Sequence, residues 1–172
     1  MPFSPTPISG LQIFEPHVFG DERGYFFESY NEQMFREAGI DCVFVQDNQA
    51  MSTKGVLRGL HFQKGDSAQA KLVRVIAGEV FDVAVDLRPG SPTKGQWFGA
   101  YLSGENQRQM FVPRGFAHGY LVTSDVAVFA YKCDNLYYPE NEGGRLYNDP
   151  DIGIEWPDLG MEYVVAARDL EW

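Results

Sequence analysis

Short apolar segments recur along the middle of this chain about every ten residues, each separated from the next by a turn signal. Turn-forming sequences such as Arg88-Pro89-Gly90-Ser91-Pro92 and Ser103-Gly104-Glu105-Asn106 lie between them. Such spacing is typical of an all-β sandwich or barrel. The segments that we expect to be strands are 42–51, 56–63, 71–77, 80–87, 97–102, 109–112 and 126–133, with a further strand after the turn at 113–120.

The segment at 80–87 has the clearest strand pattern. Phe81, Val83 and Val85 alternate with polar or small residues, so they are expected to share one face, with Asp82 and Asp86 on the other. The many turn residues, 18 Gly and 10 Pro, favour short strands over long helices.

The two ends of the chain are less regular. We expect strands at 8–19 and 25–30, a turn at 20–24, and a short surface helix at 31–38 capped by Asn31 and ended by Gly39. From residue 134 onward the segment is irregular and rich in proline and glycine. No linker or repeat divides the sequence, so residues 1–172 are predicted to form a single domain.

Charge and composition exclude several classes of protein. The net charge of −10 argues against general nucleic-acid binding. No apolar run approaches the roughly 20 residues of a membrane span, and residues 1–5 lack the features of a secretory signal. Cys42 and Cys133 have no metal-type spacing, so they are interpreted as reduced thiols of a cytoplasmic protein.

The sequence Arg58-Gly59-Leu60-His61-Phe62-Gln63 is the first candidate for chemistry. His61 is one of only 3 histidines, and Lys71 follows ten residues later. A histidine with cations nearby can take a proton from a carbon beside a carbonyl. The competing interpretation is a polar residue on a half-buried strand. Strict alternation places Arg58 and His61 on opposite faces, so a shared site requires a bulge or kink at Gly59.

Several motifs together resemble the dTDP-4-dehydrorhamnose 3,5-epimerase family. They occur in the family's order and span nearly the whole chain: 21–28, 46–48, 58–63, 71–75, 113–119, 131–134, and 148–150 with 154–157. The resemblance implies a cupin-type jelly roll, formed by two antiparallel sheets with a few short helices. It also implies a homodimer, a dTDP-sugar substrate, and no metal or other cofactor.

The histidine pattern independently argues against a metal site. Metal-binding cupins use a His-x-His pair, whereas Gln63 stands two residues after His61, and His17 and His118 are isolated. A metal-dependent cupin dioxygenase is therefore disfavoured. Two functions besides the double epimerase stay open: a relative that inverts one carbon or isomerises the ketone of a related dTDP-deoxysugar, and a non-catalytic cupin sugar-binding module.

The reaction implied by the resemblance inverts C3 and C5 beside a C4 ketone, and it requires a base, an acid and a group that stabilises the enolate. His61 suits the base, Lys71 suits the enolate oxygen, and Tyr131 suits the acid because a phenol stays protonated at neutral pH. By resemblance, Asp169 holds the second nitrogen of His61. Composition and spacing alone select neither Tyr131, among 9 tyrosines, nor Asp169.

The resemblance also implies a set of substrate-binding residues. They are Arg23, Phe26, Glu28, Gln46, Asp47, Asn48, Arg58, His118, Tyr137, Glu142 and Arg168. Arg168 stands where the family usually has lysine. We expect Arg23 and Glu28 to come from a partner subunit. The dense aromatic group Phe14, Phe19, Tyr25, Phe26 and Phe27 is predicted to help build the homodimer.

Overall fold

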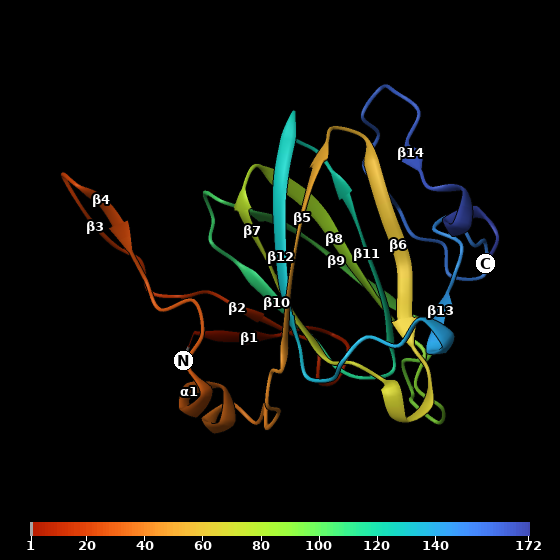
Figure 1. The fold of residues 1–172 in the computed structure, drawn as a ribbon, viewed down its shortest axis with the longest axis horizontal. Helices are drawn as coiled ribbons and strands as arrows, with labels where there is room; N and C mark the ends of the chain where they lie inside the picture. The colour runs from red at the N-terminus through yellow and green to blue at the C-terminus, as the bar shows by residue number, and fades with distance from the viewer. Residues whose placement is uncertain (1) are drawn as a thin grey trace.

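The computed structural model describes residues 2–172 and consists mainly of strands in two six-stranded sheets that face each other (Figure 1). The first sheet has the order β1-β2-β10-β7-β12-β5. Its strands are β1 (Phe3–Pro5), β2 (Gln12–Phe14), β10 (Gln109–Val112), β7 (Lys71–Ala77), β12 (Val126–Cys133) and β5 (Gln46–Thr53).

The second sheet has the order β13-β6-β11-β8-β9, and β14 pairs with β6 in parallel. Its strands are β13 (Glu142–Gly144), β6 (Val56–Gln63), β11 (Phe116–Val122), β8 (Glu79–Asp86), β9 (Trp97–Ser103) and β14 (Val164–Val165). All its other pairings are antiparallel. The two open, facing sheets form the expected cupin-type jelly roll.

Apolar residues fill both faces of the second sheet. The core between the sheets contains Val73 and Phe129 from the first sheet and Val80 and Ala84 from the second. On the other face of the second sheet, Ile152, Ile154 and Trp156 of the irregular C-terminal segment cover Phe81, Val83 and Val85. The predicted alternation of β8 is confirmed, and Asp82 therefore lies on the face toward the core.

The predicted strands at 56–63, 71–77, 109–112 and 126–133 agree with β6, β7, β10 and β12. The N-terminal prediction of one strand at 8–19 is wrong, since β2 ends at Phe14 and Pro16, which has no N–H, follows. The strand predicted at 42–51 begins only at Gln46, because Cys42 and Phe44 pack around Phe35 instead.

The strand predicted at 25–30 is also too long. A separate hairpin is formed by β3 (Phe19–Asp21) and β4 (Gly24–Phe26), and it projects from the body of the molecule (Figure 1). Phe19, Tyr25 and Phe26 are 59%, 62% and 69% exposed. Phe14 is 1% exposed within its own core, so its predicted place in an intermolecular aromatic group is wrong.

In the part of the chain that the structure describes, helical structure is limited to four short elements. The predicted helix is α1 (Glu32–Glu37); the side chain of Asn31 caps it by accepting a hydrogen bond from the Met34 N–H, and Gly39 follows with φ of +82°. The others are the 3₁₀ helices η1 (Gly65–Ser67), η2 (Pro139–Asn141) and η3 (Ala167–Leu170). Among residues 2–172, no helix is long and apolar enough to cross a membrane.

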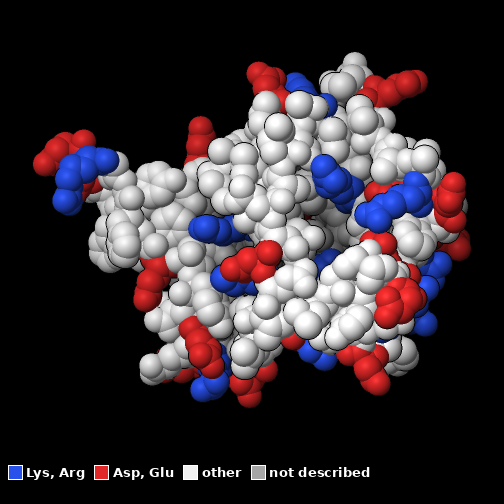
Figure 2. Space-filling view, in the orientation of Figure 1, with Lys and Arg blue, Asp and Glu red and all other residues white. Residues whose placement is uncertain are grey.

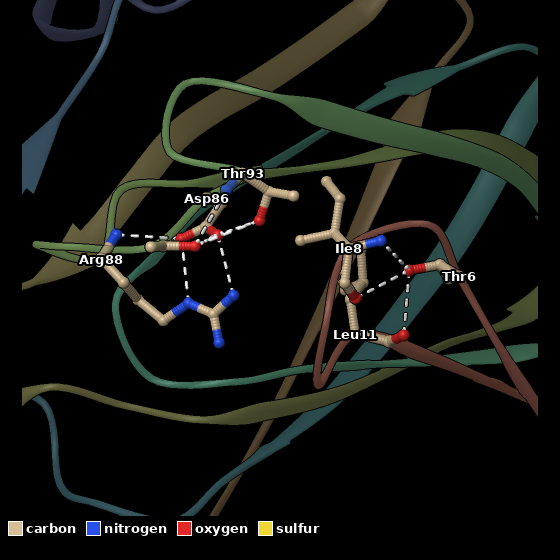
Figure 3. A network of polar contacts seen from close by, with 7 residues as sticks. Thr6, Ile8, Leu11, Asp86, Arg88 and Thr93 are labelled. Atoms are coloured by element: carbon tan, nitrogen blue, oxygen red, sulfur yellow. Dashed lines mark hydrogen bonds and ion pairs between the residues drawn. The ribbon is translucent and has the colours of Figure 1, made fainter.

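Asp86, at the end of β8, organises the turn that leads to β9 (Figure 3). Its fully buried carboxylate accepts hydrogen bonds from the side chains of Arg88, Ser91 and Thr93. Burial alone would raise the pKa of this carboxyl, but the hydrogen bonds, led by Arg88, lower it well below its ordinary value. Asp86 therefore stabilises the fold as an anion and lies outside the candidate site.

Candidate functional site

An irregularity in β6 brings Arg58 and His61 to the same face. His61 pairs with His118 of β11, whereas Arg58 pairs with Tyr120, so two residues of β6 lie opposite the single Gly119. Gly59 has φ of +119°, and a Cβ there would lie 2.7 Å from the Gly119 Cα. The expected irregular backbone at Gly59 is confirmed.

The interior face of the sandwich carries two adjoining hollows of about 270 and 370 Å³. Both are lined by His61, Lys71, Tyr131 and Arg168, so they form one continuous candidate site. Lys and Arg side chains border the hollowed face near β6 and β12 (Figure 2). Three cations, Arg58, Lys71 and Arg168, line the two hollows together with the acids Glu142 and Asp169.

His61 forms a dyad with Asp169 of η3. Its Nε2 lies 2.7 Å from the Asp169 Oδ1, while the Gly59 N–H donates to Oδ2 at 3.2 Å. Asp169 is only 2% exposed. Burial lowers the pKa of His61, and the hydrogen bond and negative charge of Asp169 partly oppose this effect. The imidazole is therefore neutral at pH 7, and Nδ1 is the nitrogen left to accept a proton.

Lys71 and Tyr131 reach the same hollows from the facing sheet, on the neighbouring strands β7 and β12. The Lys71 Nζ lies 5.8 Å from the centre of the Tyr131 ring. Burial lowers the pKa of Lys71, and burial raises the pKa of Tyr131 to about 12. The phenol is therefore protonated at neutral pH.

A second histidine–carboxylate pair lies deeper in the site. His118 Nε2 is 2.9 Å from the Asp82 Oδ2, and Asp82 is fully buried on β8. The sequence interpretation named His118 but did not include Asp82. The sequence did contain a signal for Asp82: it is an acid in a strand of apolar residues, on the opposite face from Phe81 and Val83. A buried acid requires a polar partner, so this position indicates a paired carboxylate.

The rim of the site is a connected group of polar side chains. The hydroxyl of Tyr137 donates to the Glu142 Oε2 at 3.1 Å, and Arg168 donates to the same oxygen at 3.3 Å. The side-chain amide of Gln46 donates to the Asn48 Oδ1 at 3.1 Å, and its Oε1 accepts a hydrogen bond from the backbone N–H of Tyr137. These five residues were all expected at the site, and each of them lines the hollow of about 270 Å³.

Arg58 lies at the other end of the site, in the larger hollow with His118 and Asp169. Its Nε donates to the Ser52 Oγ at 3.1 Å. Ser52 and Tyr120 belong to the surroundings of Arg58 but were missed in the sequence interpretation, as were Gln63 and Gln69 near the rim. Alternation along their strands signals Ser52, Tyr120 and Gln63 only where the register is known, and Gln69 lies in the loop before β7.

Four expected substrate-binding residues do not join this cavity within one chain. Asp47 points to the opposite face of β5 from Gln46 and Asn48, where it pairs with Lys132. Arg23 pairs with Asp21 on the projecting hairpin. Phe26 and Glu28 line a separate hollow beneath that hairpin. The cavity of a single chain is therefore built without the hairpin.

Residues 2–172 contain no cluster of three or more His, Cys, Asp or Glu side chains arranged to hold a metal ion. The donors of the site are already committed to the pairs His61–Asp169 and His118–Asp82. A neutral imidazole held by a carboxylate, facing a half-buried lysine and a protonated phenol across a jelly roll, defines a general acid–base site.

Comparisons with known proteins identify the family. The sequence profile of the family described as dTDP-4-dehydrorhamnose 3,5-epimerase matches residues 5–172. The dTDP-4-dehydrorhamnose 3,5-epimerase of Salmonella typhimurium is 60% identical over 153 residues, which cover 88% of this chain and 84% of the relative. This chain belongs to the dTDP-4-dehydrorhamnose 3,5-epimerase family.

Solved structures agree with this assignment. The structure of dTDP-6-deoxy-D-glucose-3,5-epimerase from Legionella pneumophila, in complex with dTDP-4-keto-L-rhamnose, is 53% identical with a TM-score of 0.95, and the match covers 98% of this chain and 89% of that one. A 3'-monoepimerase from Streptomyces bikiniensis, in complex with dTDP-quinovose, is 35% identical with a TM-score of 0.91, covering 97% and 84%. The fold is thus shared by enzymes that are named for two inversions and for one.

Proposed function

We infer that this chain is an isomerase that inverts C3 and C5 of dTDP-4-dehydro-6-deoxy-D-glucose to give dTDP-4-dehydro-L-rhamnose. One observation carries the mechanism: a base and an acid reach the same cavity from opposite sheets, His61 from β6 and Tyr131 from β12. Inversion at a carbon requires removal of a proton from one face and its return to the other.

In the first half of each inversion, His61 Nδ1 takes the proton from the carbon beside the C4 ketone. The electron pair of that C–H bond moves into the enolate, whose negative charge collects on the ketone oxygen. Lys71 is a compact cation that stabilises this oxygen, and partial exclusion of water strengthens the effect. Asp169 stabilises the imidazolium that has formed.

In the second half, Tyr131 gives its phenolic proton to the opposite face of the carbon. The enolate disappears, the ketone is restored, and a phenolate remains. A phenol with a pKa of about 12 gives up its proton only to a strongly basic centre such as this carbon. Proton exchange with solvent then returns the imidazolium and the phenolate to their starting states, and the same steps serve the other carbon.

The remaining residues hold the nucleotide. Arg58 is a guanidinium that can bind diphosphate oxygens in a fork. Gln46, Asn48 and Glu142 offer donors and acceptors, and Tyr137 offers a ring on which the base can stack. His118, held by Asp82, supplies a further polar contact near the reacting carbons.

The protein acts as a homodimer in the cytoplasm. The projecting hairpin exposes Phe19, Tyr25 and Phe26 to solvent in a single chain, which is unfavourable for aromatic rings. Packing against a second subunit would bury these rings and could bring Arg23 and Glu28 to the partner's cavity. Cys42 and Cys133 are free thiols, as suits a reducing compartment.

Product analysis tests this function directly. The purified protein is incubated with dTDP-4-dehydro-6-deoxy-D-glucose, the 4-keto product is reduced chemically, and the sugar configuration is determined by NMR. L-Rhamnose configuration in the wild-type reaction, absent from the reaction of His61→Ala, is the expected result. Unchanged substrate after prolonged incubation of folded, dTDP-binding protein would support the sugar-binding module instead.

A further inference from the structure

Trp172, the last residue of the sequence, packs close to the imidazole of His61. The two rings meet edge to face, with their centroids 6.3 Å apart and an interplanar angle of 72°. Trp172 lines neither of the two hollows that contain His61, so among the described residues it borders the base without lining the cavity. Figure 1 shows the C-terminus beside β13.

The seat of the indole is built by Gly144 of β13. A Cβ on Gly144 would lie 2.3 Å from two atoms of the indole ring, so Trp172 rests directly on the glycine backbone. Gly144 is also the residue that pairs with His61 across β13 and β6. The bare Cα therefore places the indole next to the strand position that carries the base.

This packing affects both the orientation and the hydration of His61. Asp169, only three residues before Trp172, fixes one nitrogen of the ring by a hydrogen bond. A single hydrogen bond leaves the ring free to tilt about that contact, whereas a ring packed beside it can limit the tilt. The side chain of His61 is 21% exposed, and burial is the largest cause of its lowered pKa.

We propose that Trp172 is a positioning residue for the base: seated on Gly144, it holds the imidazole of His61 at the angle used for proton abstraction and keeps water from its rear edge. This inference rests on the proposed role of His61. The other charged or titratable groups around the imidazole are Asp169 and Arg168 of η3, Glu142 of β13, His118 of β11, Lys71 of β7 and Tyr131 of β12. Trp172 changes the hydration of the ring without changing any of these charges.

Two independent variants remove the packing. Trp172→Ala deletes the indole, and Gly144→Ala displaces it while leaving the tryptophan in the sequence. Gly144 does not have a positive φ, so its backbone accepts alanine. Trp172→Phe keeps an aromatic ring on Gly144, so it should preserve the packing against His61. Leu170→Ala is the matched control, because Leu170 is 54% exposed on η3, next to Asp169.

The pKa of His61 is measured by NMR titration in the absence of substrate, which is practical because the chain has only 3 histidines. Both alanine variants at the seat should raise this pKa toward its ordinary value, because water regains access to the ring. The same variants should lower kcat by roughly 10- to 100-fold with KM unchanged. Trp172→Phe and Leu170→Ala should stay near wild type in both measurements.

An unchanged or lowered His61 pKa in both Trp172→Ala and Gly144→Ala would overturn the proposal, even if kcat fell. A loss of kcat/KM that comes from a rise in KM alone, with kcat unchanged, would also overturn it. Because the titration needs no substrate, it distinguishes this inference from the proposed function. A wild-type protein without epimerase activity, but with the expected pKa changes, would contradict only the function.

Discussion

Replacement of Asp169 by asparagine tests the dyad at a single atom. The Gly59 N–H donates to one carboxylate oxygen at 3.2 Å, and His61 Nε2 lies 2.7 Å from the other. Asparagine has only one oxygen, and the buried Gly59 N–H requires it as an acceptor. The new amide NH₂ must then face His61 and donate to Nε2, which forces the ring proton onto Nδ1.

This tautomer places a proton on the nitrogen that should accept one. The change also removes the charge that stabilises the imidazolium. At 2.7 Å and an effective dielectric constant of about 20, two unit charges attract by roughly 6 kcal/mol, which is an upper limit. Each tenfold change in rate corresponds to about 1.4 kcal/mol. We therefore expect kcat to fall by about 10³- to 10⁴-fold in Asp169→Asn.

The assay is kcat from initial rates of C5 epimerisation followed by NMR, together with dTDP affinity and thermal unfolding. Asp151→Asn, which changes an exposed surface carboxylate, is the matched control and should behave as wild type. Asp169→Asn should keep its fold and its affinity for dTDP. A folded Asp169→Asn protein with kcat within tenfold of wild type would refute the assigned role of the dyad.

Three further predictions follow from the described geometry, and a fourth from the absence of any metal in the proposed mechanism. The acid limb of kcat/KM should lie below pH 6.5, because burial lowers the pKa of His61 from 6.5 and only the neutral ring accepts a proton; a limb above 6.5 would contradict this. The alkaline limb of kcat/KM should lie below pH 10.5 and reflect Lys71, because burial lowers the pKa of Lys71 from 10.5 whereas the pKa of Tyr131 is about 12. Tyr131→Phe should therefore leave the alkaline limb of any residual activity in place. In a urea titration, Gly59→Ala should lower the free energy of unfolding by roughly 3–5 kcal/mol, because its Cβ would meet backbone atoms at 2.7 Å. Gly160→Ala is the control: its φ is +66° and the space around it is open, so it should cost only about 1 kcal/mol. Equal losses in the two variants would show that the close approach of Gly59 to β11 is unimportant. Full activity should survive EDTA treatment. A loss of turnover that a divalent metal restores would contradict the metal-free mechanism.

Local sequence patterns predicted the strands that carry the chemistry. The bounds of β6, β7 and β12 follow from short strand-like segments between turn signals, which need no distant information. Alternation along a strand also contained an unused signal for Asp47. Because it stands between Gln46 and Asn48 on a strand, it had to point to the opposite face.

The contacts that complete the site could not be read locally. Asp169 lies 108 residues from His61, and only the resemblance to the family connected them. The meeting of Trp172 with Gly144 depends on where an irregular segment returns to the sheet edge. The hairpin from β3 to β4 was mistaken in length because its aromatic residues resemble a buried strand, although they are exposed in one chain.

Proton exchange with solvent tests the central claim, that His61 and Tyr131 act on opposite faces of both carbons. The wild-type protein and Tyr131→Phe are incubated with dTDP-4-dehydro-6-deoxy-D-glucose in deuterated water, and label and configuration at C3 and C5 are followed by NMR. In wild type, deuterium should enter both carbons with inversion. In Tyr131→Phe, deuterium should still enter, but with retained configuration, because the imidazolium exchanges with solvent and returns the label to the original face. Label at one carbon only would identify an enzyme that inverts a single centre, and equal loss of exchange and inversion in Tyr131→Phe would contradict the division of roles.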